Sequence, residues 1–224
     1  MPRRLVATLL ASASLLLAAC DDDDPTSSRV LAEIRGANAS AATPTIDVLA
    51  DVPPVVILGD IAFNSSSGDC ARVPQGDLVF TVRAHGGTAD LATTTQTLVG
   101  ETRYTLLFLP NNAVHFLLDD AENPAANVAR LRFINAAGVN VDVYVTEPNA
   151  SLFATTPRAA ALTATPTTWI DVPTSNNHIR FTPNTSERVL LDIPSFDFGD
   201  RIVTVVLTRT AAGALSHLAV EPCS

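Results

Sequence analysis

Residues 129–143 read ARLRFINAAGVNVDV, and residues 32–48, AEIRGANASAATPTIDV, form an earlier counterpart. Each stretch begins with an alanine, reaches an aliphatic residue followed by an arginine, and continues to an Asn-Ala pair. Each then closes on an aliphatic-Asp-Val triplet, after a gap that differs by two residues. Because self-similarity at a fixed spacing is the signature of repeated structural units, the two stretches predict two copies of one unit.

Further matches follow in the same order along the chain. Val73-Pro74 matches Val172-Pro173, Phe80-Thr81 matches Phe181-Thr182, LVGETRYTLLFL (98–109) matches FDFGDRIVTVVL (196–207), and HFLLD (115–119) matches HLAVE (217–221). We therefore place the first copy at residues 29–126 and the second at 127–224. The joint AENPAAN (121–127) is short, so the two copies are expected to touch.

Each copy has the pattern of a small β-sandwich. The expected strands of the first copy are 30–35, 45–49, 55–63, 78–84, 93–98, 104–109 and 114–118. Turn signals such as Gly86-Gly87 and Asn111-Asn112 separate the later strands. Short strands without strand–helix alternation favour sandwiches over a parallel α/β sheet. The predicted fold is all-β, with two tandem antiparallel β-sandwich domains.

The two openings, the Val-Pro pairs and the strands that follow Gly100-Glu101 and Gly199-Asp200 resemble the domain of unknown function 4397. The resemblance implies immunoglobulin-like or transthyretin-like sandwiches in a secreted or surface-anchored bacterial protein. It covers both copies; the second opening matches better, and the first departs by an AATPT insertion. The family has no established catalytic residues, so none is carried over.

The N-terminus has the pattern of an export signal. Arg3 and Arg4 precede an apolar run over residues 5–17, which is shorter than the roughly 18–20 residues that a membrane-spanning helix needs. Leu17-Ala18-Ala19-Cys20 resembles the lipobox of bacterial lipoproteins. This resemblance implies removal of residues 1–19, a diacylglycerol on the Cys20 sulfur, and acylation of its amino group by a fatty acid such as palmitate. The alternative is an ordinary secretory signal with a chance cysteine.

Residues 20–28 then read as an extended, solvated tether. The four aspartates at 21–24 repel one another and repel anionic lipid headgroups, which would hold the folded part off the membrane. An aspartate directly after a lipidated cysteine resembles an inner-membrane retention signal of enteric bacteria, but the rule does not hold in all Gram-negative groups. We expect a location in the bacterial cell envelope, facing the periplasm or the cell surface, and the choice of inner or outer membrane stays open.

The charge balance argues against nucleic acid as a partner. Removing Arg3 and Arg4 from the 14 basic residues leaves 12 against 23 acidic residues, a net charge of −11. Nucleic-acid affinity depends on neutralising phosphates, which so acidic a chain does poorly. The expected partners are the membrane, through the lipid anchor, and an envelope protein or a polysaccharide.

Several polar groups could carry chemistry, and for each we favour the structural interpretation. The stretch NSSSGD (64–69) lacks the strand–Ser–helix setting of a nucleophile elbow, so a flexible hairpin loop is expected. The histidines His85, His115, His178 and His217 show no metal-ligand spacing. The carboxylates Asp119, Asp120, Glu122, Asp197 and Asp200 suit calcium or, more simply, solvated turns. Trp169 could be a sugar-binding platform, but a core position on a strand is favoured. We expect no catalytic residue, metal or cofactor.

Two cysteines remain once Cys20 is lipidated, and we predict that they form a disulfide. Paired thiols persist in the oxidising compartments that such a signal leads to. Cys70 lies in the first copy and Cys223 near the end of the second, and neither has a counterpart cysteine in the other copy. The pattern therefore favours a covalent link between the copies; two free thiols, or a bond to another molecule, are the alternatives.

These patterns favour a membrane-anchored envelope lipoprotein that acts as a non-catalytic binding, adhesion or structural module. The alternative is a hydrolase acting on envelope polymers, with its site at the interface between the two domains. An enzyme would need a convergent polar pocket with a nucleophile or an acid/base pair within hydrogen-bond distance. A binding module needs only a suitable surface or strand edge.

Overall fold

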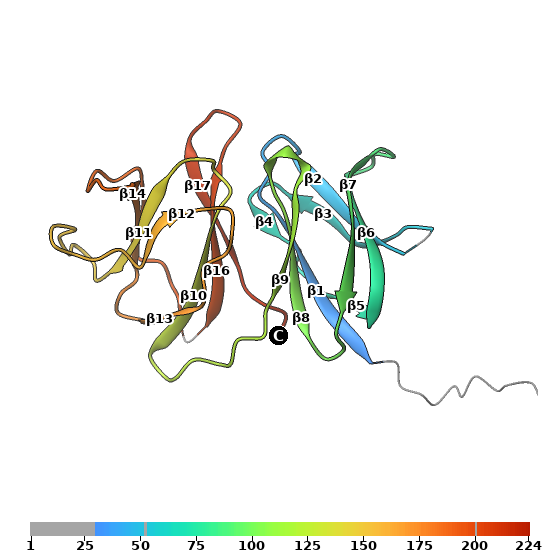
Figure 1. Ribbon diagram of the computed structural model, residues 1–224, viewed down its shortest axis with the longest axis horizontal. Coiled ribbons are helices and arrows are strands. Elements are labelled where there is room, and N and C mark those ends of the chain that lie inside the picture. The colour runs from blue at the N-terminus through green and yellow to red at the C-terminus, as the bar shows by residue number, and fades with distance from the viewer. Residues whose placement is uncertain (1–29, 52, 200) are drawn as a thin grey trace, which may run out of the picture.

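The computed structural model describes residues 30–51, 53–199 and 201–224, which form an almost entirely β structure (Figure 1). Within these residues the only helical element is a 3-10 turn, η1 (Pro110–Asn112), and no helix there is long and apolar enough to cross a membrane. The predicted signal and tether, including Cys20, lie outside the described residues. The all-β prediction is confirmed.

The strands of the first half form two sheets. One sheet has the order β4-β1-β8-β9, with β5 also paired to β1, and the other has the order β3-β2-β6-β7. The strands are β1 (Leu31–Asn38), β2 (Thr45–Ala50), β3 (Val55–Ala62), β4 (Ser65–Ser66), β5 (Ala71–Pro74), β6 (Gly76–Ala84), β7 (Asp90–Leu98), β8 (Arg103–Phe108) and β9 (Val114–Leu118).

The strands of the second half are arranged in the same way. The orders are β13-β10-β16-β17 and β12-β11-β14-β15. The strands are β10 (Val128–Asn135), β11 (Val141–Thr146), β12 (Ala159–Leu162), β13 (Ile170–Pro173), β14 (His178–Pro183), β15 (Leu191–Ile193), β16 (Ile202–Arg209) and β17 (Leu215–Val220). The sheets are antiparallel except at β1–β8 and β10–β16, because the first strand of each half lies beside a late strand that runs in the same direction.

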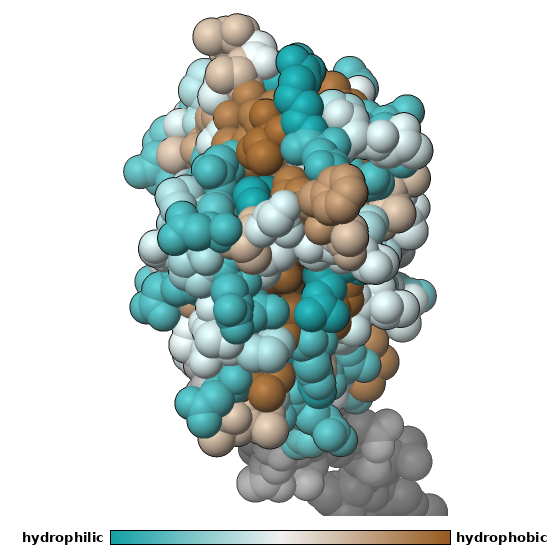
Figure 2. All heavy atoms as spheres, turned by 90° about the vertical axis from the view of Figure 1, so that its left-hand side faces the viewer, coloured by the Kyte–Doolittle hydropathy of each residue, from teal (hydrophilic) through white to brown (hydrophobic). Residues whose placement is uncertain are grey.

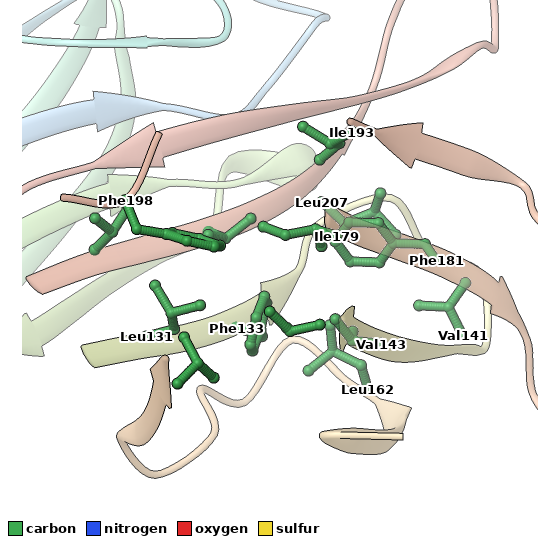
Figure 3. Close-up of a cluster of buried hydrophobic side chains, with 14 of the residues drawn as sticks. Leu131, Phe133, Val141, Val143, Leu162, Ile179, Phe181, Ile193, Phe198 and Leu207 are labelled. Atoms are coloured by element: carbon green, nitrogen blue, oxygen red, sulfur yellow. The ribbon is translucent and has the colours of Figure 1, made fainter. Parts of the chain in front are cut away.

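The four sheets stack as successive layers across the molecule (Figure 1). One apolar core lies inside the first half, and a second, drawn in Figure 3, lies inside the other half. A third core joins the two middle sheets through residues such as Leu107, Ile134 and Val206. Strands β8 and β16 are therefore buried on both faces, which explains their nearly continuous apolar sequences.

The residues shared by the two openings form the same hydrogen bonds in both halves. Asn38 is buried, and its Nδ2 donates to the carbonyls of Thr43 and Ile61; Asn135 Nδ2 donates in the same way to the carbonyls of Val139 and Leu162. The Oδ1 atom of each asparagine also accepts from the backbone N–H two residues ahead. These buried amides close the turn after the first strand of each half, since unpaired backbone groups there would be costly.

Strand register supports one of the sequence matches and corrects another. Val73 pairs with Ala32 as Val172 pairs with Ala129, so the Val-Pro pairs occupy equivalent places. In contrast, Asp47 lies opposite Arg83 whereas Asp142 lies opposite Thr182. The match of Phe80-Thr81 with Phe181-Thr182 is therefore displaced by two residues. The division at residues 126 and 127 falls in the connection 119–127, and independent folding of the halves stays a prediction.

Cys70, directly before β5, and Cys223, after β17, form a disulfide with their Cα atoms 6.0 Å apart. This is the link between the two halves that the sequence predicts. The bond fixes the C-terminal segment of the second half onto the first.

Candidate functional site

The candidate site is a cavity of about 450 Å³ at one end of the outer sheet of the second half. It is formed by the end of β11, the loop 147–158 and the segment before β14, and we call it the β11–β14 cavity. Its lining residues are Val145, Thr146, Glu147, Ala150, Thr155, Thr156, Arg158 and Asn176. Its volume falls in the range of roughly 300–1,000 Å³ that is usual for small-molecule sites.

The loop 147–158 has no counterpart of similar length in the first half. There, residues 51–54 connect β2 to β3, whereas residues 147–158 connect β11 to β12. The extra length projects at the far left of Figure 1, on the face that Figure 2 turns to the viewer. Figure 2 shows apolar residues on this face in separate patches among hydrophilic ones. A loop added to only one of two similar scaffolds points to function rather than to folding.

The loop is ordered by local contacts, and it turns one aromatic ring outward. Leu152 is buried at 7% exposure, whereas its neighbour Phe153 is 78% exposed. The backbone N–H of Arg158 donates to the carbonyl of Val143 at 2.7 Å, which ties the loop to β11. Ala154 follows with φ of 61°, in a region that non-glycine residues rarely adopt. Strain of this kind collects at functional sites, and here it lies where the chain turns Phe153 to the solvent.

A buried arginine, Arg180, lies directly behind the cavity wall. Arg180, on β14, is only 8% exposed, and its Nη2 donates to Thr146 Oγ1 at 2.6 Å. Its Nε is buried without a hydrogen-bond partner among the described residues. Among residues 30–51, 53–199 and 201–224, no carboxylate lies within ion-pair distance of the Arg180 guanidinium. Arg180 thereby fixes the Thr146 hydroxyl in the cavity wall.

A second hollow lies at the opposite side of the molecule. Its lining includes Val30, where the described chain begins, and the ion pair between Glu33 and Arg72. Arg103 at its edge donates from Nη1 to the carbonyl of Cys223 at 3.0 Å. These polar groups already have protein partners, so the hollow offers fewer free groups to a ligand than the β11–β14 cavity does.

The predicted polar residues lie apart from one another and mostly make structural contacts. His85 Nδ1 lies 2.8 Å from Asp47 Oδ1, and this hydrogen bond raises the pKa of His85. His178 Nε2 contacts Asp192. His115 lies opposite Leu107 of the third core, whereas His217 lies opposite Leu207 of the inner core, so the predicted match of the two histidines is displaced by one residue. The described residues contain no group of three His, Cys, Asp or Glu side chains that could hold a metal ion.

Residues 64–69 form an ordered segment and not the expected flexible loop. Ser65 and Ser66 form β4 against β1, and Ser67 Oγ donates to the carbonyl of Asp69 at 2.7 Å. Asn64 Nδ2 donates to the carbonyl of His217 at 2.6 Å. The segment is held because it packs between the halves.

Trp169 does not lie on a core strand as expected. It directly precedes β13 and is partly exposed, with the Arg132 guanidinium 4.2 Å from its ring centre. Asp119 is ion-paired with Arg132 and is not a solvated turn residue, and Asp197 is exposed. Asp200 lies outside the described residues. The third apolar core and this ion pair occupy part of the interface where a hydrolase site was considered, and two hollows of about 340 and 330 Å³ are lined by residues of both halves.

The sequence reasoning missed Phe153, Arg158 and Asn176. A signal was present in EPNASLFATTPR (147–158), where one phenylalanine stands in a loop otherwise rich in Ser, Thr, Pro and Asn. The absence of a matching segment in the first copy was a second signal. Neither of these two signals shows which side chains line the same cavity, because Asn176 belongs to a connecting segment other than the loop 147–158.

Comparison with known proteins gives a family and two distant structural similarities. Residues 32–144 match the family described as "Domain of unknown function (DUF4397)", so the match ends within the opening of the second half. A family 41 carbohydrate-binding module from streptococcal virulence factors, studied for alpha-glucan recognition, is 12% identical, with 78% of this chain and 92% of that chain covered and a TM-score of 0.26. The CBM26 module CBMbc of Eubacterium rectale Amy13K, solved with maltoheptaose, is 10% identical, with 84% and 96% covered and a TM-score of 0.28. At these TM-scores the similarities carry no argument about the ligand of this chain. No curated protein matches it.

Proposed function

The chain belongs to the family of the domain of unknown function 4397, and from this premise we propose that it is a non-catalytic binding module, held at the bacterial cell envelope by a lipid on Cys20. Its ligand is a saccharide, which binds in the β11–β14 cavity and extends over Phe153, a residue of the same loop that is not among the lining residues. An envelope protein as the ligand is the competing outcome of the tests below.

The exposed ring of Phe153 carries this proposal. Leaving a phenylalanine in water forgoes roughly 1.5–3 kcal/mol of burial free energy, which a ligand that covers the ring would recover. The flat apolar face of a sugar ring covers an aromatic ring well, while the sugar hydroxyls need polar partners. The Thr155, Arg158 and Asn176 side chains of the cavity supply such partners next to the loop that bears Phe153. This combination of an aromatic group with a few placed polar groups is typical of small-molecule sites.

The position of the cavity suits an anchored binding module. The start of β1, which follows the predicted tether, and the loop 147–158 lie at opposite sides of Figure 1. A tether over residues 20–28 reaches at most about 30 Å when fully extended. Such an anchor would leave the first half nearest to the membrane and turn the cavity outward, toward polymers of the envelope or its surroundings.

A binding experiment on the mature chain tests the saccharide ligand. Residues 20–224 with Cys20→Ser, incubated with purified cell-wall polysaccharides and sedimented, are expected to bind at least one of them. Phe153→Ala should reduce the bound fraction by at least about tenfold, since anchors of this kind dominate binding free energy. Val55→Ala is the matched control, because Val55 is 62% exposed in the other half. Equal binding by both variants, or capture of an envelope protein in place of every polysaccharide, would refute the saccharide site.

The anchor has its own test. Cys20→Ala in the full-length precursor should abolish lipid labelling and move the protein from the detergent phase to the aqueous phase. If this variant partitions like the wild type, the lipobox interpretation is wrong.

A further inference from the structure

The hydroxyl group of Thr146 can only accept a hydrogen bond from a ligand. Its hydrogen is used, because Thr146 Oγ1 lies 3.0 Å from the carbonyl oxygen of Glu147, which cannot donate. One of its lone pairs accepts from Arg180 Nη2 at 2.6 Å. Since Arg180 is buried, the geometry of this contact is fixed before any ligand arrives. One lone pair of this oxygen remains without a partner among the described residues.

The hydrogen of the Thr155 hydroxyl group is also used in a hydrogen bond within the protein. Thr155 Oγ1 donates to the carbonyl of Ser151 at 2.8 Å, across one turn of the loop. Both of its lone pairs are left for other partners. The carboxylate of Glu147, which also lines the cavity, adds acceptors and no donor. Three lining groups of the β11–β14 cavity therefore present acceptors.

Donors in the cavity come from Arg158, Asn176 and the hydroxyl group of Thr156. Among the described residues the Arg158 side chain makes no ion pair, so its guanidinium is available to a ligand oxygen. The cavity thus requires a ligand that both donates and accepts within a small volume. A sugar hydroxyl does both, whereas a carboxylate or sulfate group only accepts and would leave Thr146, Thr155 and Glu147 without donors.

Charge points in the same direction. The chain carries a net charge of −9, although in the cavity itself the negative charge of Glu147 is balanced by the positive charge of Arg158. Acidic polysaccharides would meet repulsion at long range, and their carboxylate or sulfate groups could not donate to the acceptors of the cavity. We infer that the ligand of the β11–β14 cavity is a neutral saccharide, bound through hydroxyl groups that donate to Thr146, Thr155 and Glu147. This inference rests on the proposed saccharide-binding function and narrows it to one chemical class.

Affinity electrophoresis separates the classes of polymer. Native gels contain either a neutral polysaccharide (dextran, galactomannan or levan) or an acidic one (polygalacturonate or alginate), at low salt. The mature chain with Cys20→Ser should be retarded by at least one neutral polymer and by neither acidic one. Retardation by acidic polymers alone would overturn the inference and leave the saccharide function standing. No retardation by any polymer would overturn both.

One substitution tests the hydrogen-bond direction itself. Thr155→Val keeps the side-chain shape and removes the acceptor, so the Kd for the retarding neutral polymer should rise roughly three- to tenfold. Thr93→Val, on the exposed face of β7 in the other half, is the control and should leave the Kd unchanged. Circular dichroism establishes that both variants fold. An unchanged Kd for Thr155→Val, in a protein whose binding Phe153→Ala abolishes, would overturn the inference while the site remained.

Discussion

Asp119 Oδ1 lies 2.6 Å from Arg132 Nη2, and this buried ion pair joins the end of the first half to the first strand of the second. Asp119 also accepts a hydrogen bond from Thr105, and Arg132 donates to Thr204. Burial raises the pKa of Asp119 and lowers that of Arg132, against the attraction between the two charges. The loss of hydration therefore offsets much of the attraction, and the pair serves to fix the relative position of the halves more than to stabilise them.

Asp119→Ala should be strongly destabilising. It leaves the Arg132 guanidinium buried without its counter-ion, and breaking a buried pair in this way costs about 3–5 kcal/mol. The double variant Asp119→Leu with Arg132→Met should recover most of that loss, because no uncompensated charge remains. Urea unfolding of the wild type and both variants measures the differences. A double variant no more stable than Asp119→Ala would contradict the account.

The Cys70–Cys223 disulfide should contribute mainly through the unfolded chain. The bond spans 153 residues of sequence, and closing so long a loop is worth up to about 5 kcal/mol on the chain-entropy model. Cys70→Ser with Cys223→Ser should lower the denaturant midpoint by a corresponding amount and leave the β-type circular dichroism spectrum unchanged. Wild type unfolded in the presence of a reductant should match the double variant. A midpoint equal to that of the oxidised wild type would show that the link adds no stability.

The strands and the disulfide could be predicted because their signals are local or countable. Alternation and turn residues mark β6 and β7, and two unmatched cysteines leave one pairing once Cys20 is lipidated. The strands β4 and β5 were missed, since two and four residues carry little periodicity. The parallel pairing of β1 with β8 depends on segments far apart in the sequence. The continuous apolar run of β16 did signal burial on both faces, and hence a middle layer, but it does not identify the sheet that covers it.

The candidate site was less predictable than the fold. Loop residues have no periodicity, and whether Phe153 points outward depends on Leu152 being anchored and Ala154 taking a left-handed conformation. Asn176 joins the cavity only through the pairing of β11 with β14. The hydrogen-bonding role of Asn38 and Asn135 was likewise hidden, although the Asn-Ala match had located both residues.

His217 should make stability depend on pH. It is half-buried on β17, and burial lowers its pKa below the ordinary value of 6.5. The unfolded chain therefore binds a proton more readily, so the free energy of unfolding should fall as pH drops through 6.5. His217→Gln should reduce this slope between about pH 7 and 5, and His115→Gln, on β9 of the first half, is the control. Identical slopes for wild type and His217→Gln would contradict the prediction.

The second half should fold alone but not remain monomeric. All the residues of its inner core, including Phe133, Val143 and Phe181, come from the second half, so residues 127–224 with Cys223→Ser should give a β-type circular dichroism spectrum. The same fragment loses the partner sheet that covers Ile134 and Val206, and exposed apolar patches of this kind drive association.

Sedimentation of residues 127–224, together with circular dichroism, distinguishes the folding of this fragment from its self-association. We expect a concentration-dependent increase in mass, which Ile134→Thr with Val206→Thr should abolish while the spectrum is retained, because threonine keeps the β-branched shape and makes the exposed face polar. A random-coil spectrum for residues 127–224 would mean that the inner core is insufficient without the middle interface. The two halves would then form one cooperative unit, in which the third apolar core and the Asp119–Arg132 pair are required for folding.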